Sequence, residues 1–133
     1  MSEFRCPIRV YIEDTDAGGI VYYVNYLKYM ERARTEFMRR HGHGKQAIFS
    51  ADLMFVVRGV EVRYRRPARL DDELVATAQI LSCGAAQLIF EQRILRGAEE
   101  LCSGTVDVVC VDRHTFKPRR LPQVMLAALS QAQ

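Results

Sequence analysis

Residues 24–41 read VNYLKYMERARTEFMRRH and carry the longest helical pattern of the chain. Apolar side chains recur there at steps of four, three and four residues, at Tyr26, Met30, Ala33 and Phe37. Charged and polar side chains occupy the opposite side, which is typical of a helix with one buried face. The pattern ends in basic residues, and Gly42 follows as a left-handed cap. The sequence therefore predicts one long amphipathic helix from about residue 24 to residue 41.

The segments around this helix have the period of β-strands. Residues 5–13 alternate apolar Ile8, Val10 and Ile12 with polar side chains. Further strand-like runs cover residues 55–66, 73–82, 87–95 and 101–111, separated by turn signals at short spacings. Such spacings favour an antiparallel meander. We expect a single α+β domain, residues 1–133, in which an antiparallel sheet wraps around the central helix, with a short helix at 121–132.

Composition and charge exclude several classes of protein. The 133 residues are 49% apolar and 26% charged, as in ordinary globular proteins, and no apolar run approaches the roughly 20 residues of a membrane helix. The first residues do not resemble a signal peptide, so we expect a cytoplasmic protein. A net charge of +3 is too small to indicate nucleic acid. The scattered cysteines are expected to be reduced and structural: Cys6, Cys83, Cys102 and Cys110.

Polar chemistry concentrates in residues 13–25, EDTDAGGIVYYVN. Carboxylates precede Gly18 and Gly19, and the predicted helix begins shortly afterwards. Backbone N–H groups at a helix start can polarise a carbonyl oxygen during acyl transfer, while the glycines allow a substrate to approach the backbone closely. A neighbouring carboxylate, Asp16, would act as a base or a nucleophile. The alternative is structural, because acidic residues and glycines before a helix also form caps and turns.

A family resemblance favours the catalytic interpretation. The run Arg9-Val10, Thr15-Asp16, Gly19-Ile20-Val21 and Tyr26 resembles the active-site signature of the 4-hydroxybenzoyl-CoA thioesterase family of hot-dog enzymes. The segments YMERARTE, FVVR, RPARLDD and VVCVDR with KPRRLP extend the likeness over nearly the whole chain, to the Tol–Pal system-associated acyl-CoA thioesterases. The resemblance implies a hot-dog fold and hydrolysis of acyl-CoA to free acid and CoA.

The resemblance also implies an assembly and a set of site residues. It implies dimers with active sites at the subunit interface, which assemble into tetramers, and it implies no separate cofactor. By position, Asp16 matches the catalytic aspartate, and the backbone amide of Tyr23 matches the group that polarises the thioester carbonyl. Asn25 and Glu31 also fall in the motif, without a predicted role. Tyr23 replaces the histidine usual in the Tol–Pal-associated enzymes, which excludes any mechanism that needs an imidazole there.

The binding of CoA phosphates is less clearly marked. Arg65 and Arg66 belong to one basic group, and residues 113–120 hold another. Either group would bind phosphates or an acidic acyl carrier protein, or would simply be a solvated face. The basic residues that benzoyl-type relatives carry in the hairpin matching residues 82–86 are absent here. Arg65 and Arg66 are therefore predicted from charge alone.

Several rival interpretations remain at this stage. A non-catalytic protein that binds acyl-CoA or acyl carrier protein would use the same groove. A hot-dog dehydratase would need a histidine near Asp16, and residues 1–40 contain none. His41 and His43 lack the pattern of a metal site. Four further residues fit core packing better than an acyl pocket: Met30, Met38, Met54 and Phe55.

Overall fold

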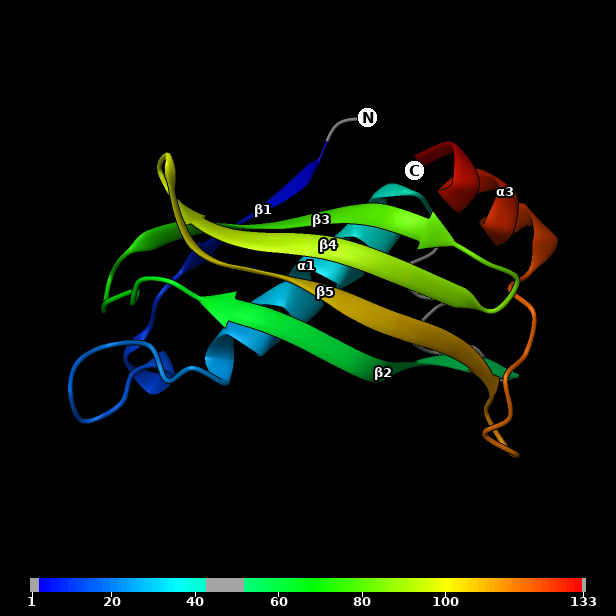
Figure 1. Cartoon of the computed structure of the whole chain (residues 1–133), viewed down its shortest axis with the longest axis horizontal. Coiled ribbons are helices and arrows are strands. Elements are labelled where there is room, and N and C mark those ends of the chain that lie inside the picture. The colour runs from blue at the N-terminus through cyan, green and yellow to red at the C-terminus, as the bar shows by residue number, and fades with distance from the viewer. Residues whose placement is uncertain (1–2, 43–51, 133) are drawn as a thin grey trace.

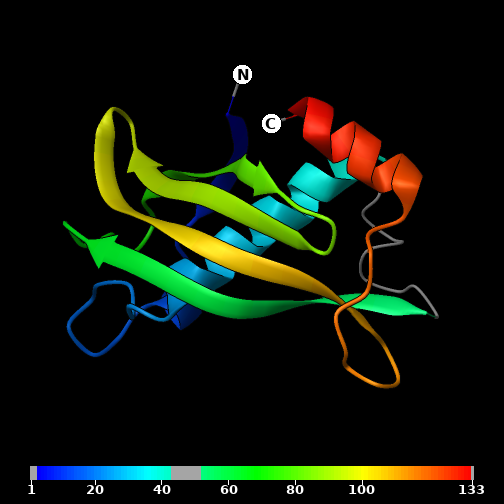
Figure 2. The same ribbon diagram turned by 45° about the vertical axis from the view of Figure 1, so that its right-hand side comes forward.

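A computed structural model describes residues 3–42 and 52–132 of the chain. Its elements, in order, are β1 (Phe4–Arg9), the short 3-10 helix η1 (Ile12–Asp14), α1 (Asn25–Arg40), β2 (Leu53–Tyr64), β3 (Glu73–Cys83), β4 (Gln87–Arg96), β5 (Glu99–Asp112) and α3 (Gln123–Ala132). The strands form a five-stranded antiparallel sheet in the order β1-β3-β4-β5-β2. The sheet curves around α1, and α3 lies beside the C-terminal end of α1 (Figures 1 and 2). The predicted α+β architecture is confirmed.

The predicted helix is confirmed within one residue at each end. Tyr26, Met30, Ala33 and Phe37 are buried, as their spacing indicated, and Gly42 follows with φ of 82°. They face the alternating inward side chains of β3, which are Leu74, Ala76, Ala78 and Ile80. Each large apolar side chain buried in this way contributes about 1.5–3 kcal/mol relative to an exposed one. The core therefore lies between α1 and the concave face of the sheet.

One buried polar side chain fixes α1 on the sheet. The amide nitrogen of Gln92, in β4, donates to the carbonyl oxygens of Met30 and Thr77, both at 2.9 Å. Its amide oxygen accepts a hydrogen bond from Arg34 at 3.0 Å. Burial lowers the pKa of the Arg34 guanidinium. Because an unsatisfied polar group in a core is costly, this network favours one position of the helix.

Two predictions about the strands were wrong. The first strand ends at Arg9, and Ile12 is 76% exposed in η1, because the Asp14 carboxylate accepts the Tyr11 N–H at 2.9 Å and turns the chain. The meander holds only for β3 to β5, since β2 pairs with β5 and not with β3. The segment after β2 crosses the start of α1, where Ala68 N–H donates to the Tyr26 hydroxyl at 2.9 Å. That crossing carries the chain past β5 and β4 to β3, which lies next to the edge strand β1.

The remaining predictions concern cysteines and membranes. None of the four cysteines forms a disulfide, and burial raises the pKa of Cys102 to about 12, which keeps this thiol neutral. Among the described residues, no helix has the length and apolar character needed to cross a membrane. The helix predicted at 121–132 is present as α3, with Met125 and Leu129 buried in the core.

Candidate active site

Asp16 lies on a short hairpin that precedes α1. Thr15 and Val21 form the bridge at its base, and the Asp16 N–H donates to the carbonyl oxygen of Ile20 at 2.9 Å. Gly19 has φ of 81°, a conformation that side chains disfavour, and its N–H donates to the Asp16 carbonyl oxygen at 3.1 Å. The hairpin projects beside the start of α1 in both views (Figures 1 and 2). The glycines therefore form the tight turn that presents Asp16.

The carboxylate of Asp16 is exposed, and one of its two oxygens accepts a hydrogen bond. The Gly18 N–H donates to Oδ1 at 2.8 Å, and a Cβ atom at position 18 would stand 3.2 Å from the same oxygen. Oδ2 accepts no hydrogen bond from the described residues. One oxygen is thus fixed while the other is open to a water molecule or an acyl carbon.

The start of α1 exposes backbone donors. The N–H groups of Asn25, Tyr26 and Leu27 bond the carbonyl oxygens three residues earlier, at 2.8, 3.3 and 3.0 Å. In contrast, the N–H groups of Tyr23 and Val24 donate to no acceptor among the described residues, and no side chain caps the helix. These donors lie at the positive end of the helix dipole. They have the chemistry needed to stabilise a developing oxyanion.

A backbone hydrogen bond joins the Asp16 hairpin to this helix start. The Tyr22 N–H donates to the Asp14 carbonyl oxygen at 2.9 Å. Asp16 follows Asp14 by two residues, and Tyr23 directly follows Tyr22. The residues that carry the predicted carboxylate and the predicted amide therefore follow closely after the two partners of one backbone hydrogen bond. Gly18 and Gly19 lie at the far tip of the hairpin, with both of their N–H groups bonded to Asp16.

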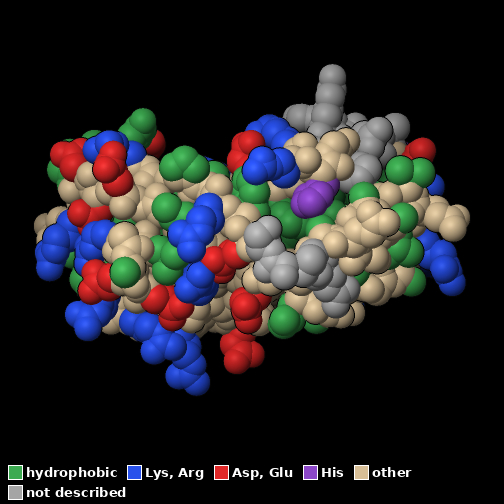
Figure 3. Space-filling view, turned by 90° about the horizontal axis from the view of Figure 1, so that it is seen from above, with side chains coloured by type: hydrophobic (Ala, Val, Ile, Leu, Met, Phe, Trp, Pro, Cys, Tyr) green, Lys and Arg blue, Asp and Glu red, His purple; other side chains and the backbone are tan. Residues whose placement is uncertain are grey.

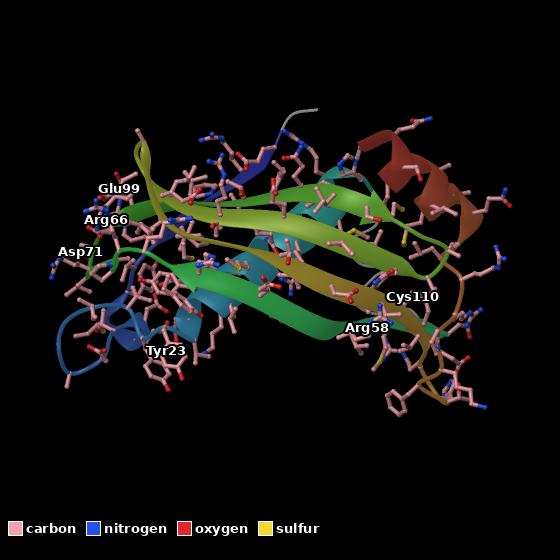
Figure 4. The ribbon with its side chains drawn as sticks, in the orientation of Figure 1. Tyr23, Arg58, Arg66, Asp71, Glu99 and Cys110 are labelled. Atoms are coloured by element: carbon pink, nitrogen blue, oxygen red, sulfur yellow. The ribbon has the colours of Figure 1, made fainter. Side chains whose placement is uncertain are left out.

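A cluster of tyrosines surrounds the helix start. The Tyr23 ring is 5.0 Å from Tyr22 and 6.0 Å from Tyr64, and the ring of Tyr64 is 5.6 Å from Tyr26. Tyr22, Tyr23 and Tyr64 remain 48%, 58% and 46% exposed. Figure 4 shows Tyr23 below the first turn of α1. Sequence reasoning missed Tyr64, because it lies at the end of β2, far from the motif along the chain.

Comparisons with known proteins show the family of the chain. The model of the thioesterase-like superfamily matches residues 10–129. The chain belongs to this superfamily. It is 46% identical to the acyl-CoA thioester hydrolase YbgC of Escherichia coli O6:H1 over 129 residues, 96% of either chain. It is 41% identical to the acyl-CoA thioesterase YbgC of Haemophilus influenzae over 126 residues, 94% of this chain and 93% of that one. The predicted resemblance to acyl-CoA thioesterases is confirmed.

Solved structures of related thioesterases place the chain in the hot-dog fold. A probable thioesterase from Bartonella henselae superposes with a TM-score of 0.83 at 35% identity, covering 91% of this chain and all of that one. A 1,4-dihydroxy-2-naphthoyl-CoA thioesterase from Synechocystis has a TM-score of 0.88 at 23% identity, covering 97% and 96% of the two chains. The second likeness shows the fold alone. The predicted hot-dog fold is confirmed.

In this thioesterase-like chain, Arg65 and Arg66 lie just beyond β2, within an ion-pair network. The Arg65 Nε is 3.1 Å from the Glu100 carboxylate, and the Arg66 Nε is 3.1 Å from that of Glu99. Figure 4 shows Arg66 and Glu99 together, and Figure 3 shows basic and acidic side chains intermingled at this end of the molecule. Both arginine side chains stay more than half exposed, at 54% and 66%. Whether they bind phosphates stays a prediction.

Two cavities lie away from Asp16 and Tyr23. The first, about 420 Å³, runs between β1 and α1 and is lined partly by Cys6, Arg9 and Arg32. The second, about 430 Å³, lies between α1 and the sheet and is lined partly by Met38, Met54 and Phe55. Of the four residues predicted to pack in the core, Met30 and Met38 are buried there, whereas Met54 and Phe55 are half-buried. In a single protomer, therefore, the candidate site is an open surface.

The histidines predicted not to bind metal are only partly covered by the structure. His41 follows the end of α1 and packs against Phe37, with ring centroids 4.5 Å apart and the ring planes tilted by 54°. His43 lies outside the described residues. No cluster of metal-binding side chains occurs within residues 3–42 and 52–132.

Proposed function

We propose that this protein hydrolyses acyl-CoA thioesters to free acid and CoA, with Asp16 as base or nucleophile. The proposal depends most on one observation: an exposed carboxylate and two unpaired helix-start amides are joined through the hydrogen bond between Asp14 and Tyr22. The 46% identity to an acyl-CoA thioester hydrolase supports the same substrate class. The Tyr23 N–H would donate to the thioester carbonyl oxygen.

Two routes fit this arrangement. In the first, Asp16 takes a proton from a water molecule, whose oxygen attacks the carbonyl carbon while the Tyr23 N–H stabilises the oxyanion. The intermediate then collapses, the C–S bond breaks, and the CoA sulfur leaves with the proton that Asp16 holds. In the second, the open oxygen of Asp16 attacks the carbon, CoA leaves as the thiolate, and water then hydrolyses the mixed anhydride. Both routes use the main chain at position 23. The exchange of the usual histidine for Tyr23 is therefore compatible with catalysis.

We also propose that the working site is formed between two copies of the chain. An acyl-transfer site normally excludes water, but Tyr23 is 58% exposed in one protomer. The outer edge of β2 has no partner strand among the described residues, and exposed side chains along it include Val57 and Val60. A long unpaired edge is a template for strand pairing. Joining two β2 edges would give a dimer, and two dimers the predicted homotetramer.

The remaining assignments concern the carrier, the phosphate contacts and the location, and they stay predictions. Acyl carrier protein is an alternative carrier of the acyl group, and Arg65 and Arg66 are candidate contacts for phosphates of either carrier. The cytoplasmic location and the association with the Tol–Pal system rest on the sequence alone. No metal or separate cofactor is part of the proposed reaction.

Asp16→Asn tests the proposal directly. Because the amide keeps the shape but loses the base and the nucleophile, kcat for a panel of acyl-CoAs should fall by about 10²-fold or more. Glu13→Gln is the matched control, since Glu13 is an exposed carboxylate nearby, and it should retain wild-type turnover. An Asp16→Asn enzyme within a few-fold of wild type would remove Asp16 from the reaction. A wild-type protein that binds a nonhydrolysable acyl-CoA analogue but releases no thiol would be the non-catalytic binding protein.

The assembly is tested on the same protein. Light scattering after size-exclusion chromatography should give two or four times the 15.3 kDa mass of the chain. A fully active monomer would refute the shared site while leaving the role of Asp16 intact.

A further inference from the structure

Asp14 is the buried counterpart of the exposed Asp16. Its side chain is 6% exposed, and both of its carboxylate oxygens accept hydrogen bonds. Oδ2 accepts from the Tyr11 N–H at 2.9 Å, and Oδ1 accepts from the side-chain amide of Asn25 at 2.9 Å. Asn25 is itself buried, 8% exposed, and is the first residue of α1. Two residues apart in sequence, the two aspartates have opposite surroundings.

Asp14 connects three separate parts of the chain. Its carboxylate accepts hydrogen bonds from Tyr11, just beyond the first strand, and from Asn25, at the start of α1. Its carbonyl oxygen accepts the Tyr22 N–H at 2.9 Å, just ahead of the free amide of Tyr23. The hairpin that carries Asp16 begins immediately after this junction. Any shift of Asp14 therefore moves the hairpin relative to the helix start.

The surroundings of Asp14 do not supply a counter-charge. No described Lys, Arg or His forms an ion pair with it; the N–H groups of Tyr11 and Asn25 donate to its carboxylate, and the Tyr29 hydroxyl lies close to it. The hydroxyl of Tyr29, one turn into α1, is buried without a hydrogen-bond partner among the described residues. Burial, followed by the neighbouring Asp14 carboxylate, raises the pKa of Tyr29 above its usual value. An apolar pair would avoid these costs, so the arrangement indicates a need for defined geometry.

We propose that Asp14 and Asn25 are positioning residues that hold the Asp16 carboxylate in the correct position relative to the Tyr23 amide. The inference rests on the proposed thioesterase activity and extends it to residues that do not touch the substrate. A misplacement of reacting groups by about 1 Å can cost on the order of 10²-fold in rate. The effect should fall on the chemical step, because both side chains are buried and their hydrogen-bonding groups are engaged with each other. Loss of the Asp14–Asn25 hydrogen bond should therefore lower kcat and leave KM nearly unchanged.

Exchanging the two side chains gives the sharpest test. Asn25→Asp alone places two carboxylates against each other in a buried site, and kcat should fall about 10- to 100-fold with KM within about threefold. Adding Asp14→Asn restores one carboxylate and one amide. The amide oxygen introduced at position 14 can accept the Tyr11 N–H, while the amide nitrogen donates to the carboxylate introduced at position 25. The double variant should recover kcat to within about threefold of wild type.

Further variants separate positioning from folding. Asn25→Ala removes the donor without adding charge and should lower kcat about tenfold, whereas Glu13→Gln, at an exposed neighbouring carboxylate, should not. Combined with Asp16→Asn, Asn25→Ala should cause no additional loss, because the group that it positions is already gone. Melting curves identify any variant that fails to fold. If Asn25→Asp does not fold, the double variant Asp14→Asn with Asn25→Asp still tests the proposal.

Specific outcomes would overturn the inference. Wild-type kcat in both Asn25 variants, or a folded double exchange that is no faster than Asn25→Asp, would show that the pair does not position Asp16. The proposed activity is judged separately, by turnover in the wild-type protein and its loss in Asp16→Asn. Failure of the positioning role is therefore distinguishable from failure of the proposed thioesterase activity.

Discussion

The two ends of α1 each carry an aromatic cluster, but the clusters differ in kind. At the N-terminal end the rings are tyrosines, and Tyr22, Tyr23 and Tyr64 are about half exposed. At the C-terminal end they are phenylalanines: Phe37 packs edge-on against Phe4 and Phe90, with centroids 6.3 and 5.5 Å apart. A tyrosine suits a surface that is apolar on one side and wet on the other. The first end therefore has the character of the surface in the proposed site, and the other closes the core.

The closing of the C-terminal end involves α3. Met125 and Leu129 are 2% and 0% exposed, and they join the same core as the α1 side chains. At the other end of α1, two backbone amides and one carboxylate oxygen lack partners among the described residues. If the proposed site is correct, stability and chemistry are concentrated at opposite ends of the helix. Substitutions at the two ends should therefore affect different measurements.

Leu129→Ala should produce the largest effect on stability. The side chain is fully buried, so its truncation leaves a cavity and should lower the free energy of unfolding by about 2–5 kcal/mol. Val124→Ala, on the same helix at a position 77% exposed, should change it by less than about 0.5 kcal/mol. Denaturant unfolding at one fixed protein concentration gives both values. If folded Leu129→Ala lost kcat as severely as Asp16→Asn, the separation between the two ends would be wrong.

Glu3→Gln should have a smaller effect that depends on pH. The hydrogen bond from Arg93, with Nε 2.9 Å from Oε2, is the main cause that holds the pKa of Glu3 below its ordinary 4.5. Because this pKa is lower in the folded state, Glu3 stabilises the protein above pH 4.5, and the contribution is lost as pH falls through the folded-state value. Glu3→Gln should lower the free energy of unfolding by up to about 1 kcal/mol at pH 7. The difference in stability between the variant and wild type should disappear in acid, where Glu3 is protonated.

The matched control for this pair is Glu73→Gln. Glu73 pairs with Arg9 on the surface, where its side chain is 77% exposed, compared with 16% for Glu3. Solvent screens an exposed pair, so its removal should have the smaller effect. Equal losses in the two variants, or a Glu3→Gln loss independent of pH, would contradict the assigned role of Glu3.

Tyr23→His should have the smallest effect. It replaces an exposed ring at the catalytic end and keeps the backbone amide, so kcat should stay within about threefold of wild type, equivalent to roughly 0.6 kcal/mol. The melting temperature should also change little, because the Tyr23 side chain is 58% exposed. Steady-state assays on short, long and aromatic acyl-CoAs would show any change in acyl preference. A tenfold change in kcat for every substrate would mean that the side chain takes part in the reaction.

Local patterns predicted much of this molecule. The helix at residues 25–40, the inward face of β3 and the hairpin turns all follow from periodicity and turn chemistry, which depend on neighbouring residues. Asp16 and Tyr23 could be predicted as site residues because the motif that carries them is continuous in sequence. The predicted strand at residues 5–13 failed at Ile12, because a hydrogen bond to the Asp14 side chain competed with the alternating pattern.

Only the tertiary structure decided which distant residues meet. It placed β2 beside β5, brought Tyr64 to the helix start, paired Arg65 and Arg66 with Glu100 and Glu99, and set Gln92 beneath α1. It also distinguished buried Asp14 from exposed Asp16, although both are acidic residues of one loop. Periodicity fixes which face of an element is apolar, but strand order and the burial of a polar group depend on packing between segments far apart in the chain.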